Sequence, residues 1–150
     1  MEEEEEFVDC VDVETRCVEL KEEGNRLFGL KEFEKASAAY TACIDLEGND
    51  KKLRAAAFCN RAACSGKLSK PSSEIIEDCT RALELQDNDY PKALLRRAAA
   101  YEAEDRLDEA LADLEAAGKS TERIKAKIEK RDQLLKDEAG LPYLPGRTVK

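Results

Sequence analysis

Five cationic and amide side chains stand at helical spacing in three separate segments of the chain. Lys21 and Asn25 are four residues apart, Asn60 follows, and Lys92 and Arg96 are again four residues apart. Residues four apart lie one turn apart on the same face of a helix, so each pair could act on one ligand. Lysine, arginine and asparagine side chains donate hydrogen bonds, whereas an ionised carboxylate only accepts them. If the three helices lie side by side, these side chains form a carboxylate site.

The competing interpretation is that these five residues are ordinary solvated side chains. That interpretation is the better one for any single residue, but the five together favour a shared site. Catalysis is not expected, because the chain has no histidine, no glycine-rich phosphate loop and no catalytic cysteine context. Four acidic residues in helical segments are expected to be solvated rather than catalytic: Glu77, Asp78, Asp113 and Glu115. The sequence therefore predicts a binding protein and not an enzyme.

The elements that must position these side chains repeat along the chain. Residues 20–49, 57–88 and 90–119 each contain two amphipathic stretches, and a small residue lies midway along the first stretch (Gly24, Ala63, Ala98). Small residues let two helices approach closely, so each segment predicts an antiparallel helix pair. The second stretch carries three small or apolar residues spaced four and three apart on one helical face. These residues are Ala36, Tyr40 and Cys43, then Ile75, Cys79 and Ala82, then Ala110, Leu114 and Ala117.

The connections between these stretches support the same division. Gly48 and the Asp87-Asn88 pair mark turns, Pro71 and Pro91 lie at helix starts, and Ser69 or Ser72 is expected to cap a helix. Residues 120–137 form one further amphipathic helix, which is expected to cover the last apolar face of the stack. The recurrence lies near the period of about 34 residues found in tetratricopeptide repeats. The expected fold is all-α, with three helix-turn-helix repeats and a C-terminal capping helix in a right-handed superhelical solenoid.

Charge and composition bound the remaining possibilities. The net charge is −9, and nine of the first 20 residues are acidic while only Arg16 is basic. We therefore expect an acidic N-terminal arm over residues 1–14, a repeat domain over 15–138 and an irregular tail over 139–150. An acidic chain argues against nucleic-acid binding. No apolar run reaches the roughly 20 residues needed to cross a membrane, and the acidic start is unlike a secretory signal, so a cytoplasmic location is expected.

Six cysteines raise the possibility of disulfides or zinc. No CxxC motif occurs and no histidine could complete a mixed zinc site. Most of the cysteines fall where a small apolar side chain would pack in a helix. We therefore expect buried free thiols, and no metal or other cofactor.

The three segments resemble the carboxylate-clamp tetratricopeptide domains of co-chaperones over about residues 16–137. That family has the motifs K-x-x-x-N, N-R and K-x-x-x-R, which stand here as KEEGN, NRAAC and KALLR. The resemblance implies that Lys21, Asn25, Asn60, Lys92 and Arg96 bind a peptide carboxylate. It further implies two secondary contacts, in which Phe28 walls the pocket for the last apolar side chain of the peptide and Lys67 meets an upstream acidic side chain.

The resemblance also implies the partner and the role. The ligand would be the C-terminal Glu-Glu-Val-Asp tail of cytosolic heat-shock chaperones of the seventy- and ninety-kilodalton classes, held in the concave groove. The chain would then be an adaptor or co-chaperone. A short peptide that makes a few charge-assisted bonds is expected to bind with a roughly micromolar constant. The alternative is a repeat scaffold that uses the groove, or its convex face, for a different protein.

Overall fold

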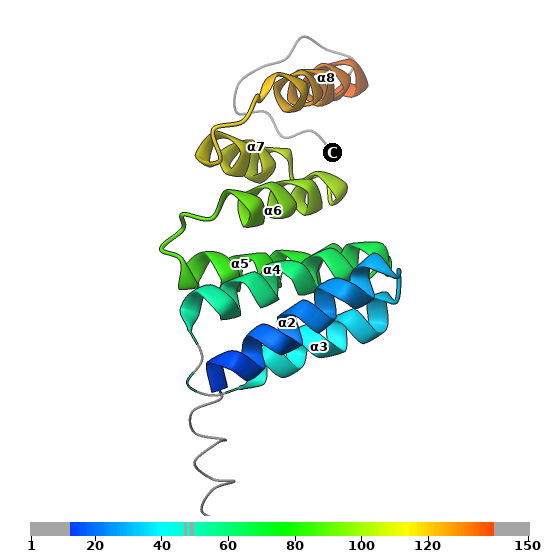
Figure 1. Cartoon of the computed structure of the whole chain (residues 1–150). Coiled ribbons are helices and arrows are strands. Elements are labelled where there is room, and N and C mark those ends of the chain that lie inside the picture. The colour runs from blue at the N-terminus through cyan, green and yellow to red at the C-terminus, as the bar shows by residue number, and fades with distance from the viewer. Residues whose placement is uncertain (1–12, 47, 49, 140–150) are drawn as a thin grey trace, which may run out of the picture.

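The computed structural model describes residues 13–46, 48 and 50–139. Over these residues the chain forms seven helices and no strand. Figure 1 shows that consecutive helices pair and that the pairs stack along one long axis, with α8 at the far end. The predicted all-α repeat solenoid is confirmed. The helices are α2 (Val13–Gly29), α3 (Phe33–Asp45), α4 (Lys51–Lys67), α5 (Ser72–Leu85), α6 (Pro91–Ala103), α7 (Leu107–Ala116) and α8 (Glu122–Ala139).

The first described helix begins, and the last one ends, within two residues of the bounds predicted for the repeat domain. Helix α2 begins at Val13, inside the arm predicted for residues 1–14, and α8 ends at Ala139, the first residue of the predicted tail. The rest of the arm and of the tail lies outside the described residues. The division into arm, repeat domain and tail stays a prediction.

The turn inside each helix pair is built in the same way three times. Lys31, Ser69 and Asp105 each have a positive φ, between 55° and 64°. In each turn the next backbone N–H donates to a carbonyl five residues earlier, at 2.8 to 3.0 Å. This hydrogen bond and the left-handed residue are the signature of a Schellman helix ending. Each first helix of a pair is therefore reversed by the same geometry.

The predicted serine cap of α5 is wrong. Ser69 is the left-handed residue that closes α4, and Ser72 is already inside α5. Pro71 stands at the N-cap and provides no side-chain cap. At the start of α4, by contrast, Asp50 Oδ1 accepts a hydrogen bond from the backbone N–H of Lys52 at 3.2 Å. The two proline positions at helix starts are as predicted, with Pro91 the first residue of α6.

Small buried residues let the helices of each pair approach closely. Gly24 and Ala98 are buried as predicted, but in the second pair the buried residue is Ala62, and Ala63 is only half-buried. The predicted register of α4 was therefore wrong by one residue. With Ala62 as reference, Asn60 and Arg96 occupy equivalent positions in their repeats, and so do Arg61 and Arg97. This register decides which side chains face the groove.

Most of the apolar residues predicted on the second helices lie in the core. Tyr40, Cys79 and Ala110 are among the most buried of them, at 1% exposure or less. Ile75, Leu114 and Ala117 are only partly buried and pack against the edges of core clusters. The core is divided into three clusters, and each cluster joins residues from successive helices. This division is the expected consequence of stacking helix pairs in one direction.

The cysteines depart from the prediction in one place. Cys17 of α2 and Cys43 of α3 are joined by a disulfide, with Sγ atoms 2.12 Å and Cα atoms 4.8 Å apart. The prediction of free thiols is therefore wrong for this pair. Cys59, Cys64 and Cys79 are buried free thiols, as predicted, and burial raises the pKa of Cys64 to about 11. Cys10 lies outside the described residues.

Helix α8 is attached to the third repeat by an apolar contact and an ion-pair cluster. Ile124 is buried against Leu107 and Ala110. Arg123 donates two hydrogen bonds to the carboxylate of Glu102, at 2.5 and 2.8 Å, and Lys127 donates to it as well. These donors, Arg123 first, lower the pKa of Glu102 to about 2. The charged form of Glu102 therefore stabilises the docked position of α8.

A pH dependence of stability follows from this cluster. The pKa of Glu102 is lowered on folding from an ordinary value of 4.5, so its contribution is complete above that value and is lost as the pH falls to about 2. We expect Glu102→Gln to melt at a lower temperature than the wild type at pH 7, with a difference that disappears near pH 2. Thermal melts of both proteins between pH 7 and 2 measure this. A difference that does not change with pH would contradict it.

Candidate functional site

The first helices of the three pairs bring the predicted binding residues to one pocket of about 210 Å³. Asn25 comes from α2, Asn60 from α4, and Lys92 and Arg96 from α6. Four of the five residues predicted to bind a carboxylate thus line a single pocket. Phe28, Tyr40 and Ala63 complete its lining.

The remaining predicted residues lie around this pocket. Lys21 is half-buried one turn before Asn25 on α2, but it does not line the pocket. Phe28, predicted as an apolar wall, is in the lining. Lys67 lies at the end of α4, in the lining of a neighbouring pocket that it shares with Arg96. The structure therefore places an amide and cationic centre at one pocket, with Lys67 in the lining of the neighbouring pocket.

A hydrogen-bond network fixes the amide side of the pocket. The hydroxyl of Tyr40 donates to Asn25 Oδ1 at 2.5 Å, and Asn60 Nδ2 donates to the same oxygen at 3.4 Å. Within the described part of the chain, no hydrogen bond engages the amide nitrogen of Asn25. Burial raises the pKa of Tyr40 to about 12, although the charge of Arg96 opposes this rise. The phenol therefore stays protonated at neutral pH and can donate.

The cationic side of the pocket has no acidic partner among the described residues. Neither Lys92 nor Arg96 forms an ion pair with a described acidic residue. Arg96 Nε is buried and has no hydrogen-bond partner among the described residues. A buried donor without an acceptor costs about 1–3 kcal/mol. Lys92 and Arg96 bring to the pocket positive charge that no described acidic residue balances, so the pocket is suited to an acceptor-rich anion.

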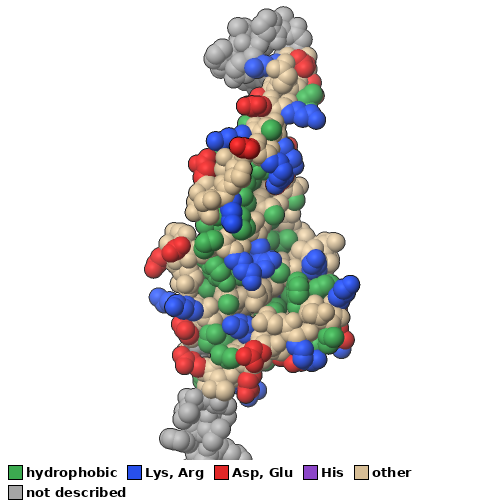
Figure 2. All heavy atoms as spheres, turned by 45° about the horizontal axis from the view of Figure 1, so that its top comes forward, with side chains coloured by type: hydrophobic (Ala, Val, Ile, Leu, Met, Phe, Trp, Pro, Cys, Tyr) green, Lys and Arg blue, Asp and Glu red, His purple; other side chains and the backbone are tan. Residues whose placement is uncertain are grey.

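A second pocket of about 420 Å³ continues from the first along α4 and α6. Its floor is formed by small and apolar side chains, and Lys67, Lys70 and Arg96 contribute positive charge. On the face drawn in Figure 2, basic side chains lie among hydrophobic ones at mid-height, and most of the acidic side chains lie towards the edges and ends. The two pockets together suit an extended chain with an anionic end and apolar side chains. The floor residues include Ala63, Gly66, Ile75, Ala99, Ala100 and Ala103.

Two arginines that were not singled out in the sequence hold the helices that carry the pocket. Arg61 of α4 donates two hydrogen bonds to Asp78 of α5, at 2.9 and 2.7 Å, and one to Thr41 of α3 at 3.2 Å. Arg61 therefore connects α4, the first helix of its pair, to the second helices α3 and α5 on either side.

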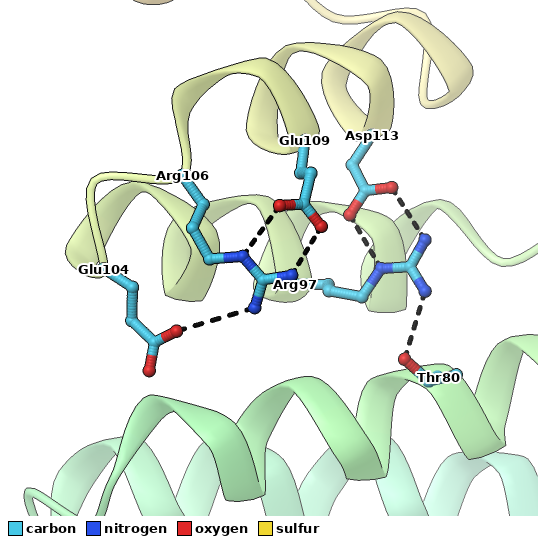
Figure 3. Close-up of polar contacts among 6 residues, drawn as sticks. All are labelled: Thr80, Arg97, Glu104, Arg106, Glu109 and Asp113. Carbon is cyan, nitrogen blue, oxygen red and sulfur yellow. Dashed lines mark hydrogen bonds and ion pairs between the residues drawn. The ribbon is translucent and has the colours of Figure 1, made fainter.

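The third repeat contains the same arrangement. Arg97 of α6 donates two hydrogen bonds to Asp113 of α7, both at 2.8 Å, and one to Thr80 of α5 at 3.1 Å (Figure 3). Asp78 and Asp113 are buried, so the prediction that they are solvated is wrong for them. Glu77 and Glu115 are exposed, as predicted.

The sequence does carry a signal for this arrangement. In the dipeptides Asn60-Arg61 and Arg96-Arg97, the first residue lines the pocket and the second pairs with a buried aspartate. Consecutive residues of a helix point in directions about 100° apart, so they serve different neighbours. The correct register of α4, with Ala62 as the buried small residue, reveals this division of roles.

Metal binding and membrane insertion have no support in the described residues. No group of three or more histidine, cysteine, aspartate or glutamate side chains described here could hold a metal ion. Between residues 13 and 139, leaving aside residues 47 and 49, no helix is long and apolar enough to span a bilayer.

Comparisons with known proteins agree with the fold and the groove. No family model matches the chain. Human DnaJ homolog subfamily C member 7 is 38% identical over 117 residues, which cover 78% of this chain and 22% of that protein. The chain spans less than a quarter of the length of the curated relatives that it matches.

Two solved structures are similar over most of their length. The second TPR domain of Spaghetti (RPAP3), bound to the Hsp90 peptide SRMEEVD, has a TM-score of 0.62 and 33% identity over 69% of this chain and 91% of that one. The TPR2B domain of yeast Sti1, in its complex with pHsp70, has a TM-score of 0.64 and 29% identity over 80% of this chain and 98% of that one. The three repeated helix pairs and these likenesses show that the chain belongs to the tetratricopeptide-repeat (TPR) domains.

Proposed function

We propose that the chain is a TPR adaptor that binds the C-terminal carboxylate of a partner protein in the pocket between α2, α4 and α6. The observation that carries this proposal is the convergence of Asn25, Asn60, Lys92 and Arg96 on one pocket. Two cations and two amides supply donors to an anion that can only accept. Lys21, one turn from Asn25 on α2, would add a third cation from the rim.

The partner that we propose is the Glu-Glu-Val-Asp tail of heat-shock chaperones of the seventy- and ninety-kilodalton classes. The similar domains of Spaghetti and Sti1 support this choice, since their structures contain chaperone peptides. The final aspartate would place two carboxylates near Lys92 and Arg96. The apolar floor of the second pocket would receive a side chain further upstream, and Lys67 at its rim would meet an upstream acidic side chain.

The role that we propose is recruitment in the cytoplasm rather than catalysis. The donors of the pocket are lysine, arginine and asparagine, and no acidic side chain in the described part of the chain is among its lining residues. We further propose a relationship to tetratricopeptide repeat protein 1, a small adaptor, on the sequence of residues 94–115. The proposed partners include neither nucleic acid nor membrane.

A titration with two forms of one peptide tests this proposal. We expect the free acid of SRMEEVD to bind with a roughly micromolar constant and its C-terminal amide to bind at least about 10-fold more weakly. The amide form has no ionised carboxylate at its C-terminus, so it loses the charge-assisted hydrogen bonds to that group. Each such bond contributes about 1.5–3 kcal/mol. Calorimetry or fluorescence anisotropy measures both constants. A folded chain that binds neither form would contradict the proposal and favour the alternative scaffold with a different partner.

A further inference from the structure

Tyr40 reaches the pocket from behind, through a contact that only glycine allows. Its ring packs against Gly24 of α2, where an added Cβ would stand 2.5 Å from Tyr40 Cε1. Real Cβ atoms do not approach an aromatic carbon this closely, so Gly24 is needed for the ring to lie there. The tyrosine is 1% exposed, yet its hydroxyl meets the side chain of Asn25 in the pocket. The absence of a side chain at Gly24 thus lets the Tyr40 ring lie where its hydroxyl reaches Asn25.

Comparison of the three repeats shows that this contact occurs once. The residue after the buried small residue is asparagine in the first repeat and alanine in the other two. The central residue of the apolar set on the second helix is tyrosine in the first repeat, and cysteine and leucine in the others. A hydroxyl is therefore present only where an asparagine stands opposite it. The equivalent residues are Asn25, Ala63 and Ala99, and Tyr40, Cys79 and Leu114.

We propose that Tyr40 is a positioning residue of the carboxylate pocket, whose hydroxyl holds the Asn25 amide with its nitrogen free to donate to the ligand. This inference rests on the proposed function. It adds a residue that acts through Asn25, by deciding what the Asn25 amide presents to the ligand.

The hydrogen bonds around Asn25 select one of its two amide orientations. Oδ1 accepts from both Tyr40 and Asn60, as a carbonyl oxygen with two lone pairs can. Rotating the Asn25 amide by 180° would require the Asn60 amide to rotate with it and the Tyr40 hydroxyl to change from donor to acceptor, so the three side chains set the amide orientation together. The observed orientation leaves the Asn25 nitrogen for an outside acceptor. Fixing it before binding removes an ordering cost that a free side chain would have.

The variant that tests this role is Tyr40→Phe, which removes the hydroxyl and keeps the ring against Gly24. We expect the free acid of SRMEEVD to bind about 2- to 10-fold more weakly, as the loss of one net hydrogen bond predicts. In an Asn25→Ala background the same change is expected to have no further effect, because the residue that Tyr40 orients is gone. Tyr101→Phe, which changes a tyrosine outside the pocket, is the matched control and is expected to leave binding unchanged.

A second readout does not depend on the peptide. The side-chain NH₂ resonances of Asn25 in an amide NMR spectrum are expected to shift in Tyr40→Phe and to stay in place in Tyr101→Phe. Unchanged Asn25 resonances, or equal losses of affinity with and without Asn25, would overturn the positioning role. A wild-type chain that does not bind the peptide would instead overturn the proposed function, and the NMR comparison would still decide the role of Tyr40.

Discussion

Replacing both Lys92 and Arg96 with alanine is expected to weaken binding of the SRMEEVD free acid by about 10²- to 10⁴-fold. Each side chain can donate charge-assisted hydrogen bonds worth about 1.5–3 kcal/mol, and the two contributions multiply in the binding constant. Both residues belong to α6 and line the same pocket, and Arg96 Nε is buried without a partner among the described residues. The double variant removes the positive charge contributed by α6 to this pocket.

The fold should survive this change. Neither side chain forms an ion pair with a described acidic residue, and removing a buried unpaired donor relieves a cost. Circular dichroism should therefore show unchanged helicity and a melting temperature at or above that of the wild type. A control with Arg81→Ala and Lys119→Ala removes two charges from exposed positions outside the pocket and should lower affinity by less than about twofold. Equal losses in both double variants would point to general charge attraction and contradict a defined site.

Arg97→Ala is expected to lower the free energy of unfolding by about 3 kcal/mol. The change leaves the carboxylate of Asp113, only 7% exposed, without the guanidinium that donates to it twice. Breaking one side of a buried pair costs about 3–5 kcal/mol, and the lower end applies because Arg97 retains 19% exposure. Urea unfolding followed by circular dichroism measures the loss.

Arg106 provides the matched control in the same repeat. It donates two hydrogen bonds to Glu109, at 2.7 and 2.6 Å (Figure 3), but these side chains retain 44% and 48% exposure. Exposed pairs of this kind contribute about 0–1 kcal/mol, so Arg106→Ala should change stability little. Replacing Arg97 and Asp113 together with apolar residues should recover most of the loss, since no charge is then left unpaired. Similar losses for Arg97→Ala and Arg106→Ala would contradict the importance of burial.

The sequence was sufficient for the array of helices and for most of the pocket. Helical periodicity and the recurring small residues predict the paired helices, because close packing of two helices needs small side chains at the contact. Asn25, Asn60, Lys92 and Arg96 were predicted together and lie together. Spacing alone could not separate Lys21 from them, because residues four apart share a helix face without lying at the same depth in a groove.

The features that were missed depend on contacts between segments distant in sequence. Asp78 was expected to be solvated because an aspartate on a helix usually is, and only the position of Arg61 explains its burial. The disulfide joins residues 26 apart, and its geometry depends on how two helices face each other. The error at Ala63 arose because NRAAC contains adjacent alanines, and periodicity could not decide which one is buried.

In two groove helices, a residue that lines the pocket is followed directly by an arginine that holds the helices together. Arg61 and Arg97 each reach a second helix on both sides, so the spacing between the groove helices is set by side chains that do not line the pocket. Neighbouring residues Asn60 and Arg96 are consequently free to change without disturbing that spacing. Substitutions at residues 60 and 96 can therefore change the lining of the pocket while the arginine–aspartate pairs that hold the helices stay in place.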